Sequence, residues 1–95
     1  MNDQDLVRRL RRSKRTVDML GTDLQREHLN GKLLADIDDQ MENGITSDPR
    51  CSGLRERVDA LRESTLTPRP ELFRDTIRLC EKLKDAMEEV VNRIR

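Results

Sequence analysis

Residues 73–94 read FRDTIRLCEKLKDAMEEVVNRI, and this stretch decides the fold. Mostly apolar side chains recur in it at alternating steps of three and four, a spacing that places them along one side of an α-helix. They are Phe73, Thr76, Cys80, Leu83, Met87, Val90 and Ile94. Lys, Arg, Asp and Glu fill the opposite side, which we expect to contact water. The spacing predicts an amphipathic helix over residues 70–94 that packs against other helices through a coiled-coil-like seam.

A second seam lies near the N-terminus. Its members step by four and three along one side of a helix: Leu6, Leu10, Ser13, Val17, Leu20 and Leu24. The apolar residues that follow are Leu29, Leu33, Leu34, Ile37, Met41 and Ile45. At ~100° per residue, this later set points more than a quarter-turn away from the first. The N-terminal half therefore presents two apolar faces.

Two helix-breaking signals lie near this change of face, at Gly21 and at the pair Asn30–Gly31. The chain could fold back there, giving two separate helices, or one long helix could offer different faces to different neighbours. We favour one long helix over residues 3–43, bent near one of these glycines. Helix-forming residues flank both of them, and a single glycine costs a helix only ~1 kcal/mol.

A short helix is expected in the middle of the chain. Asn43 and Gly44 end the first element. Asp48 followed by Pro49 predicts a new start, because Asp suits the cap and Pro suits the first helical position. The apolar stripe of this helix, over residues 49–64, consists of Leu54, Val58 and Leu61. The prolines between residues 64 and 70 predict a connecting loop.

These patterns together predict an all-α protein with a single domain over residues 1–95. We expect a small bundle of three or four helices, with helical ranges of about 3–43, 49–64 and 70–94.

The composition restricts how these helices can bury a core. The chain has 95 residues, of which 40% are charged and 34% hydrophobic, and Phe73 is its one aromatic residue. A core of Leu, Val, Ile and Met favours narrow seams between helices, which a second chain often completes. We therefore expect a dimer or larger assembly, either of this chain or with another helical protein. The side chains expected to bind the partner are Leu10, Val17, Leu20, Leu83, Met87, Val90 and Ile94.

Charge is distributed unevenly, although the formal net charge is zero. Residues 1–26 hold seven Lys or Arg against four Asp, whereas residues 27–48 hold one Lys against six acidic residues. Most of the basic residues form one run: Arg8, Arg9, Arg11, Arg12, Lys14 and Arg15. Such a run could contact phosphates or other anions, or its cations could flank the apolar seam and cover it with their aliphatic stems. We favour the flanking interpretation, because the cations lie on both sides of the seam that Leu6, Leu10, Val17 and Leu20 form. The lack of a nearby aromatic side chain to stack on bases further disfavours single-strand binding.

An acidic cluster offers the basic run a counterpart. It consists of Asp36, Asp38, Asp39 and Glu42. We hypothesise that, in an antiparallel dimer or against the next protomer of an assembly, the basic end of one helix lies near the acidic end of another. Opposite charges there would fix the orientation more than the strength of association.

Residue types that usually carry catalysis or bind metals are sparse. His28 is the one histidine, and Cys51 and Cys80 lack the spacing of metal ligands. We expect no enzyme activity, no cofactor and no metal. No apolar run has the length of a signal-peptide core or a membrane span, and the N-terminal helix lacks aromatic anchors. We therefore expect no membrane binding. Cys80 lies on an apolar helix face, where a reduced thiol acts as a small hydrophobic side chain, so we expect a reducing location, cytoplasmic or nuclear.

These observations lead to one functional expectation and one alternative. We expect a non-enzymatic protein–protein interaction module, such as a helical scaffold, adaptor, small chaperone or regulator, that acts through homo- or hetero-oligomeric helix packing. The alternative is a dimeric nucleic-acid-binding regulator that presents the run from Arg8 to Arg15 to phosphates.

Overall fold

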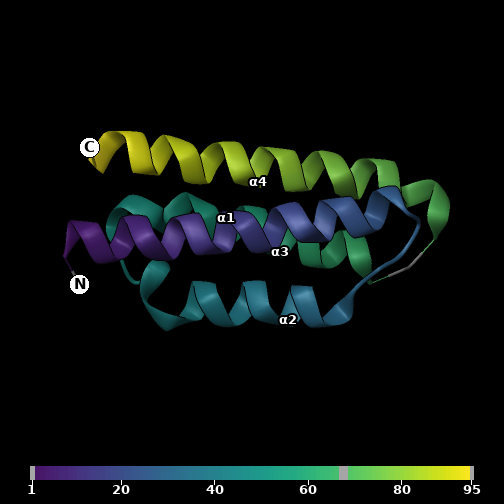
Figure 1. The fold of residues 1–95 in the computed structure, drawn as a ribbon, viewed down its shortest axis with the longest axis horizontal. Helices are drawn as coiled ribbons and strands as arrows, with labels where there is room; N and C mark the ends of the chain where they lie inside the picture. Colours follow the sequence, from purple (N-terminus) through teal and green to yellow (C-terminus); the bar gives the residue numbers. More distant parts are fainter. Residues whose placement is uncertain (1, 67–68, 95) are drawn as a thin grey trace.

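Four α-helices form the bundle in the computed structural model, which describes residues 2–66 and 69–94. They are α1 (Asp3–Gln25), α2 (Gly31–Gln40), α3 (Ser52–Thr65) and α4 (Phe73–Ile94). Each helix runs antiparallel to the next, and α4 lies beside α1, so the start of α1 and the end of α4 share one end of the bundle (Figure 1). No strand occurs within the described ranges, and the predicted all-α bundle is confirmed.

The N-terminal half folds back on itself, so the prediction of one long helix over residues 3–43 is wrong. α1 ends at Gln25, and Glu27 has a positive φ of 59° that interrupts any helix. α2 then starts with Asn30 as its cap. The side-chain oxygen of Asn30 accepts hydrogen bonds from the backbone N–H groups of Lys32 and Leu33, at 3.1 and 3.3 Å. The two apolar faces explain this outcome, because folding back turns both of them toward one core.

The remaining boundaries agree with the sequence signals. Gly44, at φ 114°, lies inside the π-helical turn Met41–Ile45 that follows α2. The Asp48 side chain accepts a hydrogen bond from the backbone N–H of Arg50 at 2.9 Å, and Pro49 opens a 3₁₀ turn, Pro49–Cys51, that leads into α3.

The C-terminal range begins in the same way as the middle one. A 3₁₀ turn over Pro70–Leu72 precedes α4, so the predicted range 70–94 contains a 3₁₀ turn followed by an α-helix. Of the loop predicted between residues 64 and 70, residues 67 and 68 lie outside the described residues.

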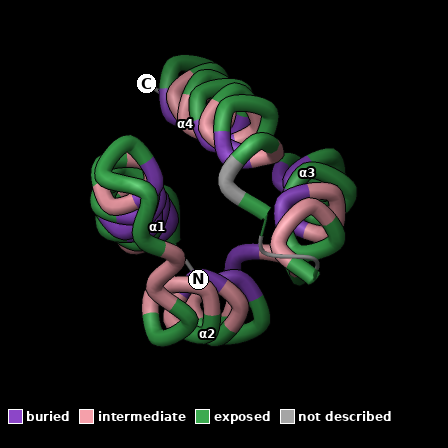
Figure 2. The backbone as a smooth tube through the Cα atoms, turned by 90° about the vertical axis from the view of Figure 1, so that its right-hand side faces the viewer, coloured by how far each residue is buried: buried purple, intermediate pink, exposed green. Residues whose placement is uncertain are grey.

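The core lies along the axis of the bundle. Figure 2 shows the buried side of each helix facing inward and the exposed side facing outward. The largest fully buried side chains are Leu6, Leu10, Val17, Leu20, Leu24, Ile37, Met41, Ile45, Leu61, Leu83, Met87 and Val91. Each aliphatic side chain of this kind stabilises the fold by ~1.5–3 kcal/mol through burial. The seams predicted in residues 6–24 and 73–94 therefore meet in one interior.

A polar cluster at the contact between α1 and α2 aligns the two helices. Ser13 Oγ donates to Gln40 Oε1 at 2.9 Å, and Gln40 Nε2 donates to Thr16 Oγ1 at 3.2 Å. Thr16 Oγ1 also donates to the backbone oxygen of Arg12 at 3.2 Å. Ser13 and Thr16 are buried, so loss of Gln40 would leave the Ser13 hydroxyl without a hydrogen bond, at a cost of ~1–3 kcal/mol, and would leave Thr16 only its bond to Arg12.

Candidate functional site

The apolar seam expected to bind a partner is closed within the chain. Leu10, Val17, Leu20, Leu83 and Met87 are 0% exposed, Val90 is 5% exposed, and Ile94 is half-buried. In this conformation the first six have almost no surface to offer to another molecule. We expected a dimer because a second chain often completes narrow apolar seams, and in this fold the helices of one chain close these seams. Self-association itself stays a prediction.

The basic run, by contrast, lies on the surface of α1. Its five arginines are exposed and Lys14 is half-buried. Steps of three and four place four of them on the side of α1 that faces away from the core: Arg8, Arg11, Arg12 and Arg15.

Internal contacts engage only part of this run. Lys14 Nζ donates to Glu88 Oε2 at 3.1 Å, and Arg9 donates to the backbone oxygen of Asn43. Arg8 approaches Asp5 to 3.9 Å, which is too long for a hydrogen-bonded ion pair. Within residues 2–66 and 69–94, no carboxylate lies at ion-pair distance from the other three arginines, Arg11, Arg12 and Arg15.

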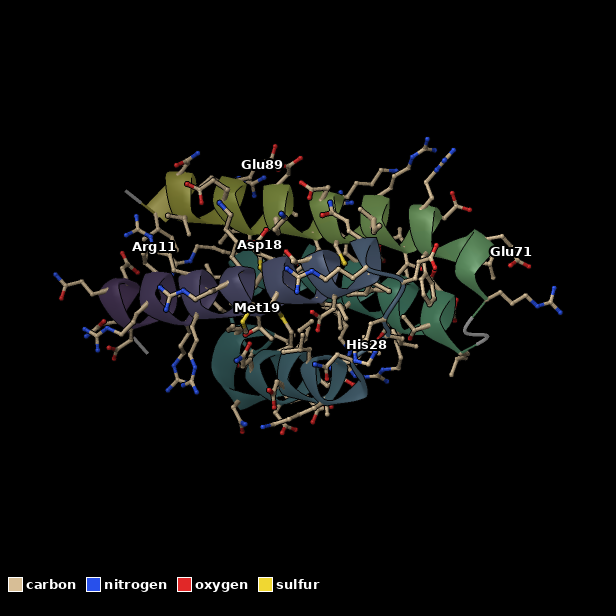
Figure 3. All side chains as sticks on the ribbon, turned by 45° about the vertical axis from the view of Figure 1, so that its right-hand side comes forward. Arg11, Asp18, Met19, His28, Glu71 and Glu89 are labelled. Carbon is tan, nitrogen blue, oxygen red and sulfur yellow. The ribbon has the colours of Figure 1, made fainter. Side chains whose placement is uncertain are left out.

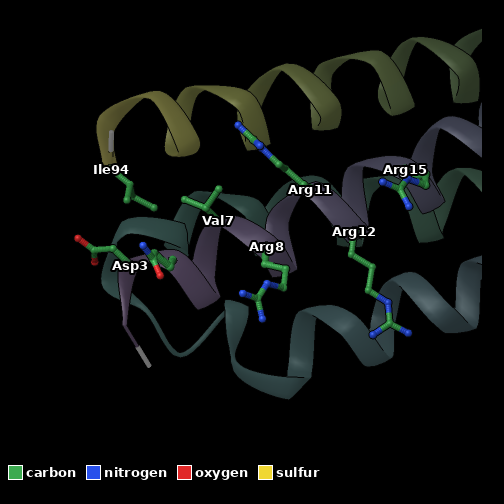
Figure 4. A pocket seen from close by; sticks show the side chains of 8 residues that line it. Asp3, Val7, Arg8, Arg11, Arg12, Arg15 and Ile94 are labelled. Carbon is green, nitrogen blue, oxygen red and sulfur yellow. The ribbon is translucent and has the colours of Figure 1, made fainter.

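An open hollow of about 820 Å³ lies between the start of α1 and the end of α4. We call it the arginine groove. Its lining residues are Asp3, Gln4, Val7, Arg8, Arg11, Arg12, Arg15 and Ile94. Figure 4 shows Val7 and Ile94 next to each other, with Arg11 extending toward α4 and Arg12 extending toward α2. The groove therefore combines a small apolar floor with a cationic rim.

Ion pairs between α1 and α4 determine where the groove opens. Lys84 Nζ lies 2.8 Å from Asp18 Oδ1, and Lys14 pairs with Glu88 closer to the end of the bundle. Figure 3 shows Arg11 and Asp18 on the side of α1 that faces α4. Among the residues that the structure describes, no further ion pair joins the two helices beyond Lys14. The groove occupies the stretch without such pairs.

Lys84 is held in its charged form. Burial lowers the pKa of its ammonium group, but the hydrogen bonds that Asp18 and Glu81 accept from it outweigh burial and raise the pKa above its ordinary value. The central part of the contact between α1 and α4 therefore stays ion-paired at neutral pH, whereas the groove keeps unpaired cations.

Comparisons with family models, with curated proteins and with solved structures find no match to this chain. The groove is therefore interpreted from its own residues.

The acidic cluster is divided by the fold. Asp38 forms an ion pair with Arg62 of α3, and this hydrogen bond raises the pKa of the Arg62 guanidinium. Asp36 and Asp39 instead border a hollow of about 300 Å³ whose lining also includes Arg9 and Arg12. Part of the cluster thus lies near the basic run within a single chain.

The remaining polar residues that the sequence singled out do not assemble into a site. Cys51 and Cys80 are free and buried, and burial raises the pKa of the Cys80 thiol to about 12. His28 is exposed in the connection between α1 and α2. The described residues contain no group of three His, Cys, Asp or Glu side chains that could hold a metal ion. None of the described helices has both the length and the apolar character needed to cross a membrane.

Sequence reasoning missed Val7 as part of the floor. It lies next to the seam residue Leu6 and four residues before Arg11, so one helical turn separates an apolar side chain from a cation on the same side. That spacing could have indicated a mixed surface. Its partner Ile94, however, is brought near only by the pairing of α1 with α4.

Proposed function

We propose that this chain is a non-enzymatic protein–protein interaction module that binds an acidic partner in the arginine groove. One observation carries the proposal: Arg11, Arg12 and Arg15 are exposed without a carboxylate at ion-pair distance among the described residues, beside the half-buried pair Val7 and Ile94. Guanidinium groups bind carboxylates with two parallel hydrogen bonds, and an apolar floor adds an anchoring contact.

The class of function is the one expected from the sequence, but the binding surface is the arginine groove and not the apolar seam. The residues first expected to contact a partner form the core of the bundle, and they hold α1 and α4 together. The partner-binding role then falls to the groove between the ends of these two helices. Ile94 belongs to both sets, since it is packed against the core and also lines the groove.

A protein partner fits the groove better than a nucleic acid. Phosphates could contact the arginines, but a duplex backbone offers no apolar side chain to Val7 and Ile94. Nucleic-acid binding remains the competing function in the test.

The test compares two labelled ligands by fluorescence anisotropy. One is a helical peptide with Glu and Leu on one face, and the other is a short DNA duplex. The proposal expects the peptide to bind more tightly at physiological salt. It also expects R11E/R15E to weaken peptide binding by about tenfold or more, because reversal of two charges costs ~1.4 kcal/mol in total.

The matched control is R74E/R78E. Arg74 and Arg78 are exposed on α4, are four residues apart like Arg11 and Arg15, and lie outside the groove. This control should leave peptide affinity unchanged. Tighter binding of the duplex than of the peptide, or equal losses in both double variants, would contradict the proposal. Circular dichroism of each variant shows whether the helices remain intact.

A further inference from the structure

Two stripes of opposite charge lie side by side on the outer face that α1 and α2 form. The basic stripe consists of Arg8, Arg12 and Arg15 on α1. The acidic stripe consists of Asp36 and Asp39 on α2. Asp36 is half-buried, and the other four side chains are exposed.

The stripes occupy the same level along the bundle. Three contacts establish the antiparallel alignment: Arg9 with the backbone oxygen of Asn43, Ser13 with Gln40, and Asp23 with Asn30. Residues 8–15 of α1 therefore run alongside the end of α2 and the turn after it. The hollow of about 300 Å³ lined by Arg12, Asp36 and Asp39 lies between the stripes.

The stripes do not neutralise each other within the chain. Across the described part of the chain, no ion pair joins Arg8, Arg12 or Arg15 to Asp36 or Asp39. Figure 4 shows Arg12 extending toward α2, the helix that carries the acidic stripe. Both rows of charge are thus available to another molecule on one continuous face.

We propose that this face binds a second copy of the chain about a two-fold axis parallel to the bundle. Rotation about such an axis exchanges left and right across the interface but preserves the level along the helices. It therefore places the basic stripe of each copy over the acidic stripe of the other. Every contact between the stripes occurs twice, as a two-fold interface requires.

The mixture of charges selects a second copy over other partners. A uniformly acidic partner that covered both stripes would be repelled by Asp36 and Asp39, and a uniformly basic one by the arginines. A second copy of this face carries charges of both signs, and after the two-fold rotation each stripe faces the stripe of opposite charge. Met19, which is 46% exposed on α1 four residues beyond Arg15, adds an apolar contact to this face.

The dimer face and the arginine groove share part of their arginines. Those that both line the groove and form the basic stripe are Arg8, Arg12 and Arg15. Arg11 extends toward α4, and Val7 and Ile94 lie at the end of the bundle between α1 and α4, so these three residues stay outside the proposed interface (Figure 4). A second copy and an acidic protein therefore compete for the shared arginines, and sedimentation of the chain alone tests the dimer without the groove ligand.

Sedimentation velocity of the full chain tests the dimer. The interface consists mainly of exposed ion pairs, so we expect a concentration-dependent dimer at low salt that dissociates as salt is added. The variants R12E and D39R should each weaken self-association by about tenfold or more, because each places two like-charge contacts in the symmetric interface.

Mixing the two variants gives the sharpest outcome. In a mixed dimer, Arg12 of the D39R chain faces Asp39 of the R12E chain. The other half of the interface brings together the two substituted side chains, a glutamate and an arginine, which also have opposite charges. The mixture should therefore dimerise as well as the original chain, although each variant alone does not. R11E serves as the control, and it should dimerise normally.

Three results would overturn the dimer. They are a monomer at every concentration and salt, a dimer indifferent to R12E and D39R, and a mixture of the two variants that fails to associate. Unchanged circular dichroism of R12E and D39R ensures that a loss of association does not come from unfolding.

Discussion

Lys14 Nζ donates to Glu88 Oε2 across 3.1 Å, and among the described residues this is the last ion pair between α1 and α4 before the arginine groove opens. Its two side chains are 39% and 42% exposed, so water screens much of their attraction. The pair stabilises the bundle little. Its position matters more, because the Glu88 carboxylate borders a hollow that Arg11 and Arg15 also line.

Replacement of Glu88 by Gln should separate binding from stability. We expect the free energy of unfolding in urea to fall by less than ~1 kcal/mol, since exposed ion pairs rarely contribute more. Affinity for the acidic peptide should rise, because Lys14 becomes available to the partner and a repulsive charge disappears. Anisotropy titrations of E88Q and of the control E71Q, at the opposite end of the bundle in Figure 3, measure the difference. Equal affinities in both variants would contradict this role of Glu88.

Truncation of the core should cost far more than truncation of the groove floor. Leu83 is 0% exposed, so L83A should lower the free energy of unfolding by ~2–5 kcal/mol through lost burial and the cavity left behind. Ile94 is half-buried, so I94A should lower the free energy of unfolding clearly less than L83A does. Urea denaturation of the two variants gives the comparison. A larger loss in I94A than in L83A would show that the end of α4 is packed differently.

Gln40 should be needed for the alignment of α2 on α1. Q40A removes one acceptor and one donor, leaving Ser13 and Thr16 without their partner on α2. The expected loss is ~1–3 kcal/mol in the free energy of unfolding, the cost of unsatisfied buried polar groups. Hydrogen exchange should also accelerate in residues 31–40 more than in α4. Uniform acceleration across all helices would instead indicate a global effect.

Asp48 should make the stability of the bundle sensitive to acid. Hydrogen bonds from the side chain and the backbone N–H of Arg50 hold the pKa of Asp48 below its ordinary value of 3.8. A carboxyl whose pKa is lower in the folded than in the unfolded chain contributes stability above its unfolded pKa, and loses it as pH falls through the folded value. The difference in free energy of unfolding between the original chain and D48N should therefore shrink below pH 3.8. Urea titrations at neutral and strongly acidic pH measure this, and a constant difference would exclude the mechanism.

Helix periodicity was sufficient to predict most of the fold. The stripes of α1 and α4 span whole helices, and Asp48 with Pro49 marks a helix start through its capping chemistry. The fold-back between Gln25 and Gly31 was predicted only as the alternative to one long helix. Its local signals, Asn30 and one glycine, contribute little free energy, and the packing of two apolar faces against a common core decides the outcome in the same direction.

The site was predicted only in part. The exposed arginines follow from the sequence, because cations opposite an apolar stripe have to face water. The residues that surround these arginines in the fold do not follow from the sequence. Val7 meets Ile94 through contacts between residues far apart in the chain, and Lys14 is withdrawn from the rim by Glu88 of α4. Such pairings depend on which helices become neighbours, a property that spacing within one helix does not contain.

The hydrogen bonds of Gln40 to Ser13 and Thr16 also bear on the connection between Glu27 and Asn30. The side-chain contacts of α2 select its alignment on α1. The length of the connection therefore does not have to set this alignment. Extra residues inserted between Glu27 and His28 should change the closure entropy by only ~0.6 kcal/mol for each doubling of loop length. The turn is thus a natural place to graft a foreign peptide without disturbing the bundle.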